Sequence, residues 1–263
     1  MKRAKSDYVI LAVSNALRVL EAFRNEGELG VTELGRRLGL HKNNVFRILA
    51  TLEQQGYVEQ CGENDAYRLG VRCLQLGRCY AESRSLLRAA RPVLEALVRR
   101  SGESAHLAEL RGLEVVHLDG ELSPSLVQTG LRVGRTLPAH CTALGKVLLG
   151  CGRAEVQERF DQEVVPRGLE ARTPLTVVDR DKLLEHLHAV AANGWATDVE
   201  ECERGLCCAA APVFDASGDL VAALSISGPS VRLCEDALQR AAVPAVLAAA
   251  QDLSRQLGYA VTG

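Results

Sequence analysis

The sequence predicts an α+β protein built from an N-terminal winged helix-turn-helix, a helical linker and a C-terminal domain in which helices flank an antiparallel sheet. Three observations support this fold class. Two short helical patterns separated by a glycine occupy residues 31–58, a hairpin pattern follows them directly, and strand and helix patterns alternate beyond Gly102. A chain of 263 residues is long enough for two cores, and we place the domain limits at 1–72, 73–90 and 91–263.

The N-terminal domain is predicted to begin with two helices. The first carries an apolar stripe and ends near residues 24–27; its members are Val13, Ala16, Leu17, Leu20 and Phe23. In the second, Leu34 and Leu38 are four residues apart and share one face. Thr32 is expected to be its N-cap residue, and Gly39 is expected to end it in the left-handed conformation.

A third helix over residues 41–55 combines an apolar face with a polar, basic N-terminal face. The apolar positions follow the spacing i, i+3, i+4, i+7 and are Val45, Ile48, Leu49 and Leu52. Arginine and lysine can bind guanine O6 and N7 or phosphates, and asparagine can pair with adenine N6 and N7. We therefore predict that this region contacts double-stranded DNA through Thr32, Arg36, Lys42, Asn43, Asn44 and Arg47.

A polar helix face is also common on proteins that bind no DNA, so the segment after this helix matters. Gly56 ends the helix, residues 57–60 read as a strand, 61–66 as a turn and 67–69 as the returning strand. Three helices followed by a β-hairpin form a winged helix-turn-helix, which favours the DNA-binding interpretation.

The rest of the chain is predicted to be a linker followed by an antiparallel sheet with helices. The pattern from Val71 to about Arg100 is helical, and Pro92 is expected to begin a new helix. The strands expected beyond it are 105–110, 113–118, 127–133, 206–214 and 220–227. The helices expected are 142–149, 179–192 and 234–257, with Pro244 kinking or breaking the last one.

Charge is unevenly placed along the chain and does not indicate a uniformly basic surface, and we expect a cytoplasmic protein because no signal peptide or membrane span is recognised. Residues 1–72 hold 11 Lys and Arg against 9 Asp and Glu, a net of +2, so the remainder of the −2 chain carries −4. Between Arg36 and Arg47 there are cationic side chains and no acid. The longest apolar run, 241–250, is interrupted by Pro244 and too short to span a bilayer. No membrane association or signal peptide is expected.

The nine cysteines show no C-x-x-C pair and no zinc-finger spacing with histidine. We therefore expect free thiols in a reducing compartment, no metal site and no cofactor.

Several spaced motifs together resemble the IclR family of bacterial transcriptional regulators. They are the winged helix followed by YRLG (67–70), LPAHCTALGKVLL (137–149) and GWATDVEECERGLCCAAAPVFDASGDLVAALSISGP (194–229). The resemblance covers residues 10–258. It implies a DNA-binding domain, a linker helix and a GAF-like α/β effector-binding domain, assembled as a homodimer or homotetramer on operator DNA.

The resemblance also implies where a small-molecule effector binds, namely at Ala143, Leu144, Asp198, Cys208, Ser225 and Ser227. Residue chemistry agrees in part. Thr142 could cap a helix whose first backbone N–H groups would bind a carboxylate, and Ser225 and Ser227 share one strand face. An organic acid, either a small carboxylate or an aromatic acid, is the expected effector. Each of these residues also has an ordinary structural interpretation as a cap, a core residue or a strand hydroxyl.

Two departures from the family pattern leave alternatives open. Cys207 stands where the family often has an arginine, and Trp195 stands where tyrosine is common. One alternative is a redox or metal switch using Cys202, Cys207, Cys208 and His117. The other is a thiol enzyme, with Cys208 or Cys141 as nucleophile, His140 as base and Asp198 orienting it. The favoured interpretation has no catalytic residues: a regulator whose operator binding changes when an effector binds.

Overall fold

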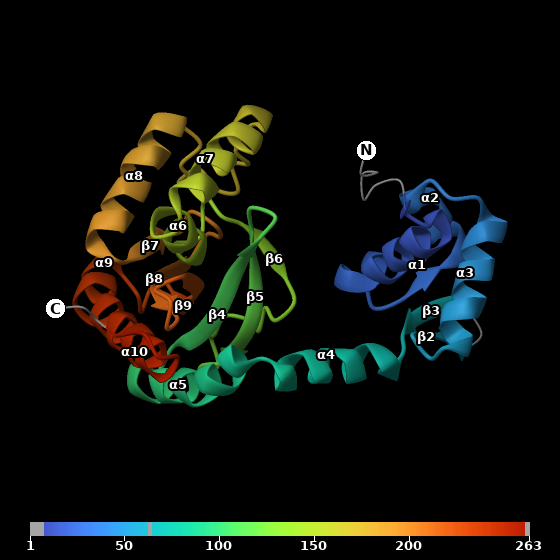
Figure 1. Ribbon diagram of the computed structural model, residues 1–263, viewed down its shortest axis with the longest axis horizontal. Coiled ribbons are helices and arrows are strands. Elements are labelled where there is room, and N and C mark those ends of the chain that lie inside the picture. Colours follow the sequence, from blue (N-terminus) through green and yellow to red (C-terminus); the bar gives the residue numbers. More distant parts are fainter. Residues whose placement is uncertain (1–7, 63–64, 261–263) are drawn as a thin grey trace. The chain divides into compact units, whose positions relative to one another are not determined.

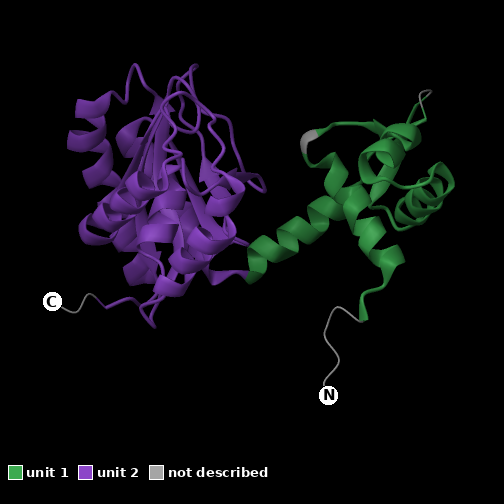
Figure 2. Cartoon of the chain, turned by 90° about the horizontal axis from the view of Figure 1, so that it is seen from above, with its two compact units in different colours: residues 1–83 green, residues 84–263 purple. Residues whose placement is uncertain are grey.

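The computed structural model describes residues 8–62 and 65–260, which form two compact units. One unit ends at Ser83 and the other begins at Arg84 (Figure 2). Glu63 and Asn64, in the predicted wing turn, lie outside the described residues. No helix in the described residues is both long enough and apolar enough to cross a membrane.

The N-terminal unit consists of three helices, a three-stranded sheet and a fourth helix (Figure 1). Its elements are α1 Leu11–Ala22, η2 Phe23–Asn25, β1 Leu29–Gly30, α2 Val31–Leu38, α3 Lys42–Gln54, β2 Val58–Cys61, β3 Ala66–Leu69 and α4 Val71–Ser83. The strands pair antiparallel in the order β1-β3-β2, which confirms the predicted wing. The core of the unit contains Val19, Phe23, Leu34, Val45 and Leu49.

Two expectations for this unit are wrong. Of the predicted stripe, Ala16, Leu20 and Phe23 pack into the core together with Val19, whereas Val13 and Leu17 are more than half exposed. This helix carries two apolar stripes, and periodicity alone does not tell which one faces the core. Thr32 is not the N-cap of α2, because the helix begins at Val31 with Gly30 as its cap. Gly39 ends α2 with φ 67°, as predicted.

The C-terminal unit is a six-stranded antiparallel sheet in the order β6-β5-β4-β9-β8-β7, covered by helices on both faces. Its strands are β4 Ser104–Arg111, β5 Glu114–Glu121, β6 Thr136–Pro138, β7 Ala196–Val199, β8 Leu206–Phe214 and β9 Leu220–Pro229. Its helices are α5 Ser85–Ser101, α6 Ala143–Gly150, α7 Ala154–Glu163, η4 Val165–Arg167, α8 Arg180–Asn193, α9 Glu235–Ala237, η5 Leu238–Ala242 and α10 Val243–Gln256.

The two faces of this sheet bury different kinds of side chain. On the face toward α5 and α10, branched residues such as Leu107, Leu224 and Ile226 build a large apolar core. On the face toward α6 and α8, the strands contribute small residues that include Ala108, Ala210 and Ala223 (Figure 1). Because side chains alternate along a strand, positions 106, 208, 225 and 227 also lie on this second face.

Two predictions for the C-terminal unit need correction. Pro92 lies inside α5, which begins at Ser85. The helix is packed in the core on both sides of the proline, through residues such as Leu87, Ala90 and Leu94. Residues 127–133 form no strand, and the edge strand beside β5 is β6. The short elements β7 and α7 were not predicted. The expected break near Pro244 is a π-helical segment, η5, that ends directly before α10.

Candidate DNA-binding surface and effector cavity

The surface of α3 that faces away from the core carries the predicted DNA-contacting residues. Val45, Leu49 and Leu52 are buried, whereas Lys42, Asn43, Asn44 and Arg47 are all exposed. His41 caps the helix, with its Nδ1 accepting a hydrogen bond from Asn43 N–H at 3.3 Å. The core side chains fix the rotation of α3, so its polar N-terminal face is presented to solvent.

Sequence reasoning missed Phe46, whose side chain is 56% exposed in the middle of α3. It lies one turn after Lys42, and the exposed Ala50 lies one turn after it. The signal was present in the sequence, because Phe46 falls outside the spacing of the core residues. An exposed aromatic ring and a methyl group on this face suit contact with thymine methyl groups.

Two cations of α2 are partly neutralised. Glu33 accepts hydrogen bonds from Arg36 Nε and Nη2 at 2.9 and 2.7 Å and from Arg37 Nε at 2.5 Å. These contacts lower the pKa of Glu33 to about 2, so the carboxylate stays ionised. The sequence reasoning counted no acid between Arg36 and Arg47, but Glu33 reaches them from one turn earlier. Among the described residues, Lys42 and Arg47 form no ion pair.

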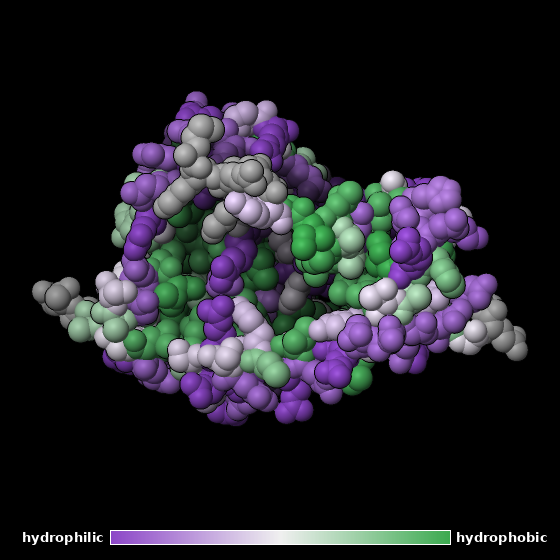
Figure 3. Space-filling model, turned by 45° about the vertical axis from the view of Figure 1, so that its right-hand side comes forward, coloured by the Kyte–Doolittle hydropathy of each residue, from purple (hydrophilic) through white to green (hydrophobic). Residues whose placement is uncertain are grey.

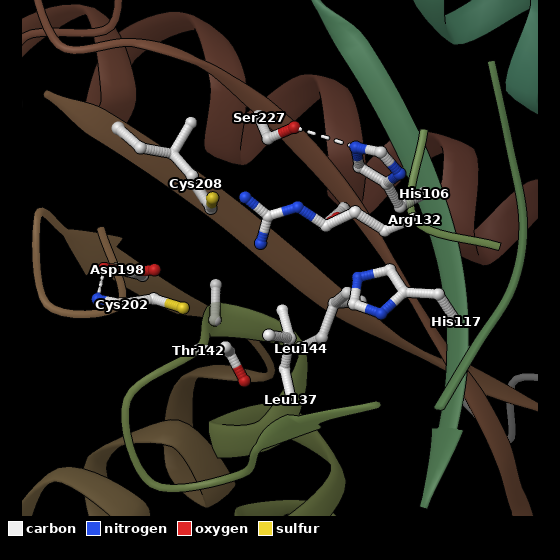
Figure 4. A pocket seen from close by; sticks show the side chains of 13 residues that line it. His106, His117, Arg132, Leu137, Thr142, Leu144, Asp198, Cys202, Cys208 and Ser227 are labelled. Carbon is white, nitrogen blue, oxygen red and sulfur yellow. Dashed lines mark hydrogen bonds between the residues drawn. The ribbon is translucent and has the colours of Figure 1, made fainter. Parts of the chain in front are cut away.

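All six residues predicted for the effector site line one small cavity in the C-terminal unit, with a volume of about 30 Å³ (Figure 4). Sheet register explains the grouping. Cys208 lies opposite both Asp198 and Ser227, and Ser225 lies opposite His106. The cavity forms where the alanine positions under α6 give way to polar ones. Its other lining residues are His106, His117, Arg132, Leu137, Thr142, Cys202 and Leu206.

The N-terminus of α6 forms one wall of the cavity. Thr142 caps it as predicted: its Oγ1 accepts from Gly145 N–H at 3.1 Å and donates to Pro138 O at 3.0 Å. The first intrahelical bond runs from Lys146 N–H to Thr142 O, so the N–H groups of Ala143 and Leu144 have no acceptor within the helix. A Cβ at Gly145 would lie 2.2 Å from Ala139 O, so only glycine permits this approach.

Two buried histidines face the cavity and remain neutral. Burial lowers the pKa of His106 to about 3 and that of His117 to about 4. His106 Nε2 lies 3.0 Å from Ser227 Oγ (Figure 4), and Ser227 Oγ in turn lies 3.0 Å from Thr129 Oγ1. The Nδ1 atoms of both rings are buried and lack a hydrogen-bond partner within the described structure. Neutral imidazoles can donate to or accept from a ligand.

Asp198 holds the turn after β7 against the cavity. Its Oδ1 accepts hydrogen bonds from Glu201 N–H at 2.8 Å and Cys202 N–H at 3.3 Å, whereas its buried Oδ2 has no partner among the described residues. Burial raises the pKa of Asp198 to about 7. The same turn carries a buried ion pair, in which Glu201 Oε1 lies 2.5 Å from Lys146 Nζ of α6.

Arg132 is a cavity residue that sequence reasoning did not single out. It lies in the coil between β5 and β6, and its guanidinium extends across the cavity toward Cys208 (Figure 4). Arg132 Nη2 donates to Glu203 Oε2 at 2.8 Å. Nothing local in the sequence marks this arginine, because the coil reaches the cavity only through tertiary packing.

The thiol-enzyme alternative finds little support in this geometry, whereas a hydrogen bond with Cys141 and the nearby Arg172 and Arg132 lower the pKa of the Cys202 thiol. His140 Nε2 contacts Glu170 O at 3.0 Å, and burial raises the pKa of the Cys208 thiol. Cys207 packs into the core beneath the opposite sheet face, so it lies apart from Cys202 and Cys208. No group of three or more His, Cys, Asp or Glu side chains among the described residues is arranged to hold a metal ion.

Comparisons with known proteins agree across both units. Residues 12–62 match the model of the IclR helix-turn-helix domain, and residues 78–255 match that of the bacterial transcriptional regulator IclR C-terminal domain. The HTH-type transcriptional regulator KdgR of Escherichia coli (strain K12) is 36% identical over 94% of each chain.

Two solved structures are similar over nearly the whole chain. An IclR transcriptional regulator from Alicyclobacillus acidocaldarius has a TM-score of 0.85 at 26% identity, covering 95% of this chain and 100% of its own. An IclR homologue from Microbacterium hydrocarbonoxydans, solved in complex with 4-hydroxybenzoate, has a TM-score of 0.78 at 27% identity, covering 94% and 98%.

Proposed function

The chain belongs to the IclR family of bacterial transcriptional regulators, and we propose that a small organic acid bound in the cavity of its C-terminal unit controls its binding to operator DNA. The protein is a DNA-binding regulator with an effector-binding domain. The finer assignments below concern its DNA contacts, its effector and its assembly. Because bacterial operators lie in the cytoplasm, the protein acts there.

The DNA contacts are assigned to the exposed face of α3. Lys42, Asn43, Asn44 and Arg47 supply the polar contacts, and Phe46 adds an apolar one. Thr32 and Arg36 of α2 are assigned to the DNA backbone, since the first helix of the motif crosses it. To contact a phosphate, Arg36 would give up its hydrogen bonds to Glu33 and donate to the phosphate instead.

The proposal that the effector is an acid rests on one observation. Arg132 and the first backbone amides of α6 line the same cavity, so two kinds of anion-binding group are available there. Ser225 and Ser227 add hydroxyl groups, and the neutral His106 and His117 suit a hydroxyl or carbonyl elsewhere on the ligand. The 4-hydroxybenzoate complex of a relative supports this chemical class, because that ligand combines a carboxylate with a hydroxyl group.

The assembly is assigned to at least a homodimer. Helix α4 has no buried residue, and its apolar side chains Val71, Leu74 and Leu76 are more than half exposed. Leu11 and Leu17 of α1 are exposed as well. Figure 3 shows hydrophobic surface exposed among hydrophilic residues. Exposed apolar surface of this kind suits a second copy, which would also supply the second recognition helix for a palindromic operator.

The experiment that tests this function begins by selecting the operator from a random pool of duplexes. Binding of the selected duplex by the full-length protein is then titrated with small carboxylic acids. We expect one or more acids to change operator affinity by about 5- to 150-fold, the usual range of allosteric coupling. A protein that selects no sequence, or whose operator affinity no acid alters, would contradict the proposal.

A pH dependence of effector binding follows from Asp198. An anionic ligand raises the already elevated pKa of this carboxyl further, so a proton is taken up on binding. Affinity for 4-hydroxybenzoate, whose carboxylate stays ionised, is therefore expected to fall above pH 7, by at most about tenfold per pH unit. Calorimetry at pH 6, 7 and 8, in two buffers of different ionisation enthalpy, measures both the affinity and the proton uptake.

Asp198→Asn is the control for this pH dependence, because an amide oxygen can still accept from the N–H groups of Glu201 and Cys202. Its affinity is expected to be independent of pH over the same interval. The titratable groups around Asp198 are Lys146, Glu201 and the thiols of Cys141, Cys202 and Cys208, and the variant leaves all of them in place. An unchanged pH profile in the variant would assign the titration to another group.

A further inference from the structure

Arg132, the cationic residue that lines the cavity, already forms an ion pair with Glu203 of the protein itself. Arg132 is largely shielded, with 18% of its side chain exposed, whereas its partner Glu203 is 62% exposed. The two ends of this ion pair therefore lie in different surroundings, with the guanidinium inside the cavity (Figure 4) and the carboxylate mostly in water.

The charges around the guanidinium leave it as the cationic group that faces a ligand. Besides the two histidines, the ionisable side chains that line the cavity are Arg132, Asp198, Cys202 and Cys208. Arg132 lies near both thiols, and it helps to lower the pKa of Cys202. His106 and His117 are neutral at physiological pH because of their burial. Asp198 is held by the amides of Glu201 and Cys202, and no ion pair joins it to Arg132 in the described structure.

Exchange of the partner acid is favourable on physical grounds. An ion pair whose carboxylate is mostly in water contributes little, because solvent screens it and the side chain loses entropy. A ligand carboxylate inside the cavity meets the same guanidinium at a lower effective dielectric, and it can accept two parallel hydrogen bonds. Glu203, once released, returns to water at small cost.

We propose that Glu203 is an internal competitor for the effector: the acid group of the ligand displaces its carboxylate from Arg132 and takes over the guanidinium. This inference rests on the proposed acid effector and adds the group that recognises it. It makes Arg132 a determinant of ligand class, selecting acids over their neutral amides, and it makes Glu203 a determinant of affinity.

The test uses two substitutions with opposite expected signs in the full-length protein. The probes are 4-hydroxybenzoate, benzoate, pyruvate and succinate, with 4-hydroxybenzamide as the neutral counterpart, and the readout is calorimetric affinity. For the acid that binds most tightly, Arg132→Met is expected to weaken binding about tenfold or more, because a charged hydrogen bond is lost. Glu203→Gln is expected to tighten it about threefold, because the competitor loses its charge.

Arg135→Met is the matched control. This arginine is exposed on the same coil and does not line the cavity, so the variant removes an equal charge without touching the site. Its affinity is expected to stay within a factor of two of the wild type, and thermal unfolding verifies that all three variants are folded.

The possible outcomes separate the two ideas. If Arg132 and Glu203 serve only as a structural lock, both substitutions will weaken binding, and the competition model is wrong. The same holds if Glu203→Gln leaves affinity unchanged, or if the benzamide binds as tightly as the acid. If no acid of the panel binds the wild-type protein, the proposed acid effector falls and this inference falls with it.

Discussion

Replacing Arg47 or Asn43 with alanine is expected to weaken binding of the selected operator by about 5- to 150-fold for each residue. Both side chains are exposed on the face of α3 opposite Val45 and Leu49, so neither change removes a core contact. A bidentate contact to a base is lost while the fold is retained. Titration of the labelled operator at fixed salt measures the effect, and unfolding curves verify the fold.

The dependence on salt separates the roles of the α3 residues. A residue that contacts only phosphate weakens binding to all sequences alike and reduces the salt slope by about one when it is replaced, as we expect for Lys42→Ala. A base-reading residue relaxes the preference at one position. Arg240→Ala, an exposed arginine of the C-terminal unit, is the control for loss of one positive charge. Equal losses on selected and random duplexes for every α3 variant would contradict base readout.

The proposed contact between Phe46 and a thymine methyl group can be tested by changing the DNA. Operators in which single thymines are replaced by deoxyuridine lack one methyl group each, and one such change is expected to weaken binding by the wild-type protein. Phe46→Ala should be insensitive to the same replacement, because its apolar contact is already gone. Sensitivity that persists in the variant would place another residue at that methyl group.

Lys146→Met is expected to destabilise the C-terminal unit by about 3–5 kcal/mol, because it leaves the Glu201 carboxylate buried without its cation. The side chains of Lys146 and Glu201 are 4% and 11% exposed, and Glu201 Oε2 already lacks a partner in the described structure. The pair joins α6 to the turn that carries Asp198, so its loss should also weaken effector binding. Urea unfolding measures the change in free energy.

The double variant Lys146→Met, Glu201→Leu distinguishes the cause. Replacing a buried ion pair with apolar residues of similar volume is often neutral or stabilising, so most of the lost stability should return. If the double variant is as unstable as the single one, the loss arises from packing around the lysine stem rather than from an unpaired charge. Arg159→Met, which breaks an exposed i, i+4 pair with Glu163, is expected to cost less than about 1 kcal/mol.

The local chemistry of the sequence determined the helix-turn-helix, the wing and the sheet. Gly39, the spacing of Val45, Leu49 and Leu52, and the strands 206–214 and 220–227 each depend on contacts close in the chain. The error in the first helix arose because its sequence offers two apolar faces that fit a helix equally well. Val13 and Leu17 form an apolar stripe as regular as that of Ala16 and Val19, and only packing against α3 selects between them.

The residues that line the cavity likewise include some that the sequence predicted and some that only the structure revealed. Helix capping predicted Thr142, strand alternation paired Ser225 with Ser227, and the family resemblance added Asp198 and Cys208; the fold brings all of these residues to one cavity. Arg132 reaches it from a coil with no periodic pattern, and His106 and His117 enter it through strand register. Local sequence determines helices, turns and strands because their hydrogen bonds and caps join near neighbours. Only the tertiary structure decides which distant charges meet, because burial and strand pairing place Arg132 beside Glu203 and Lys146 beside Glu201.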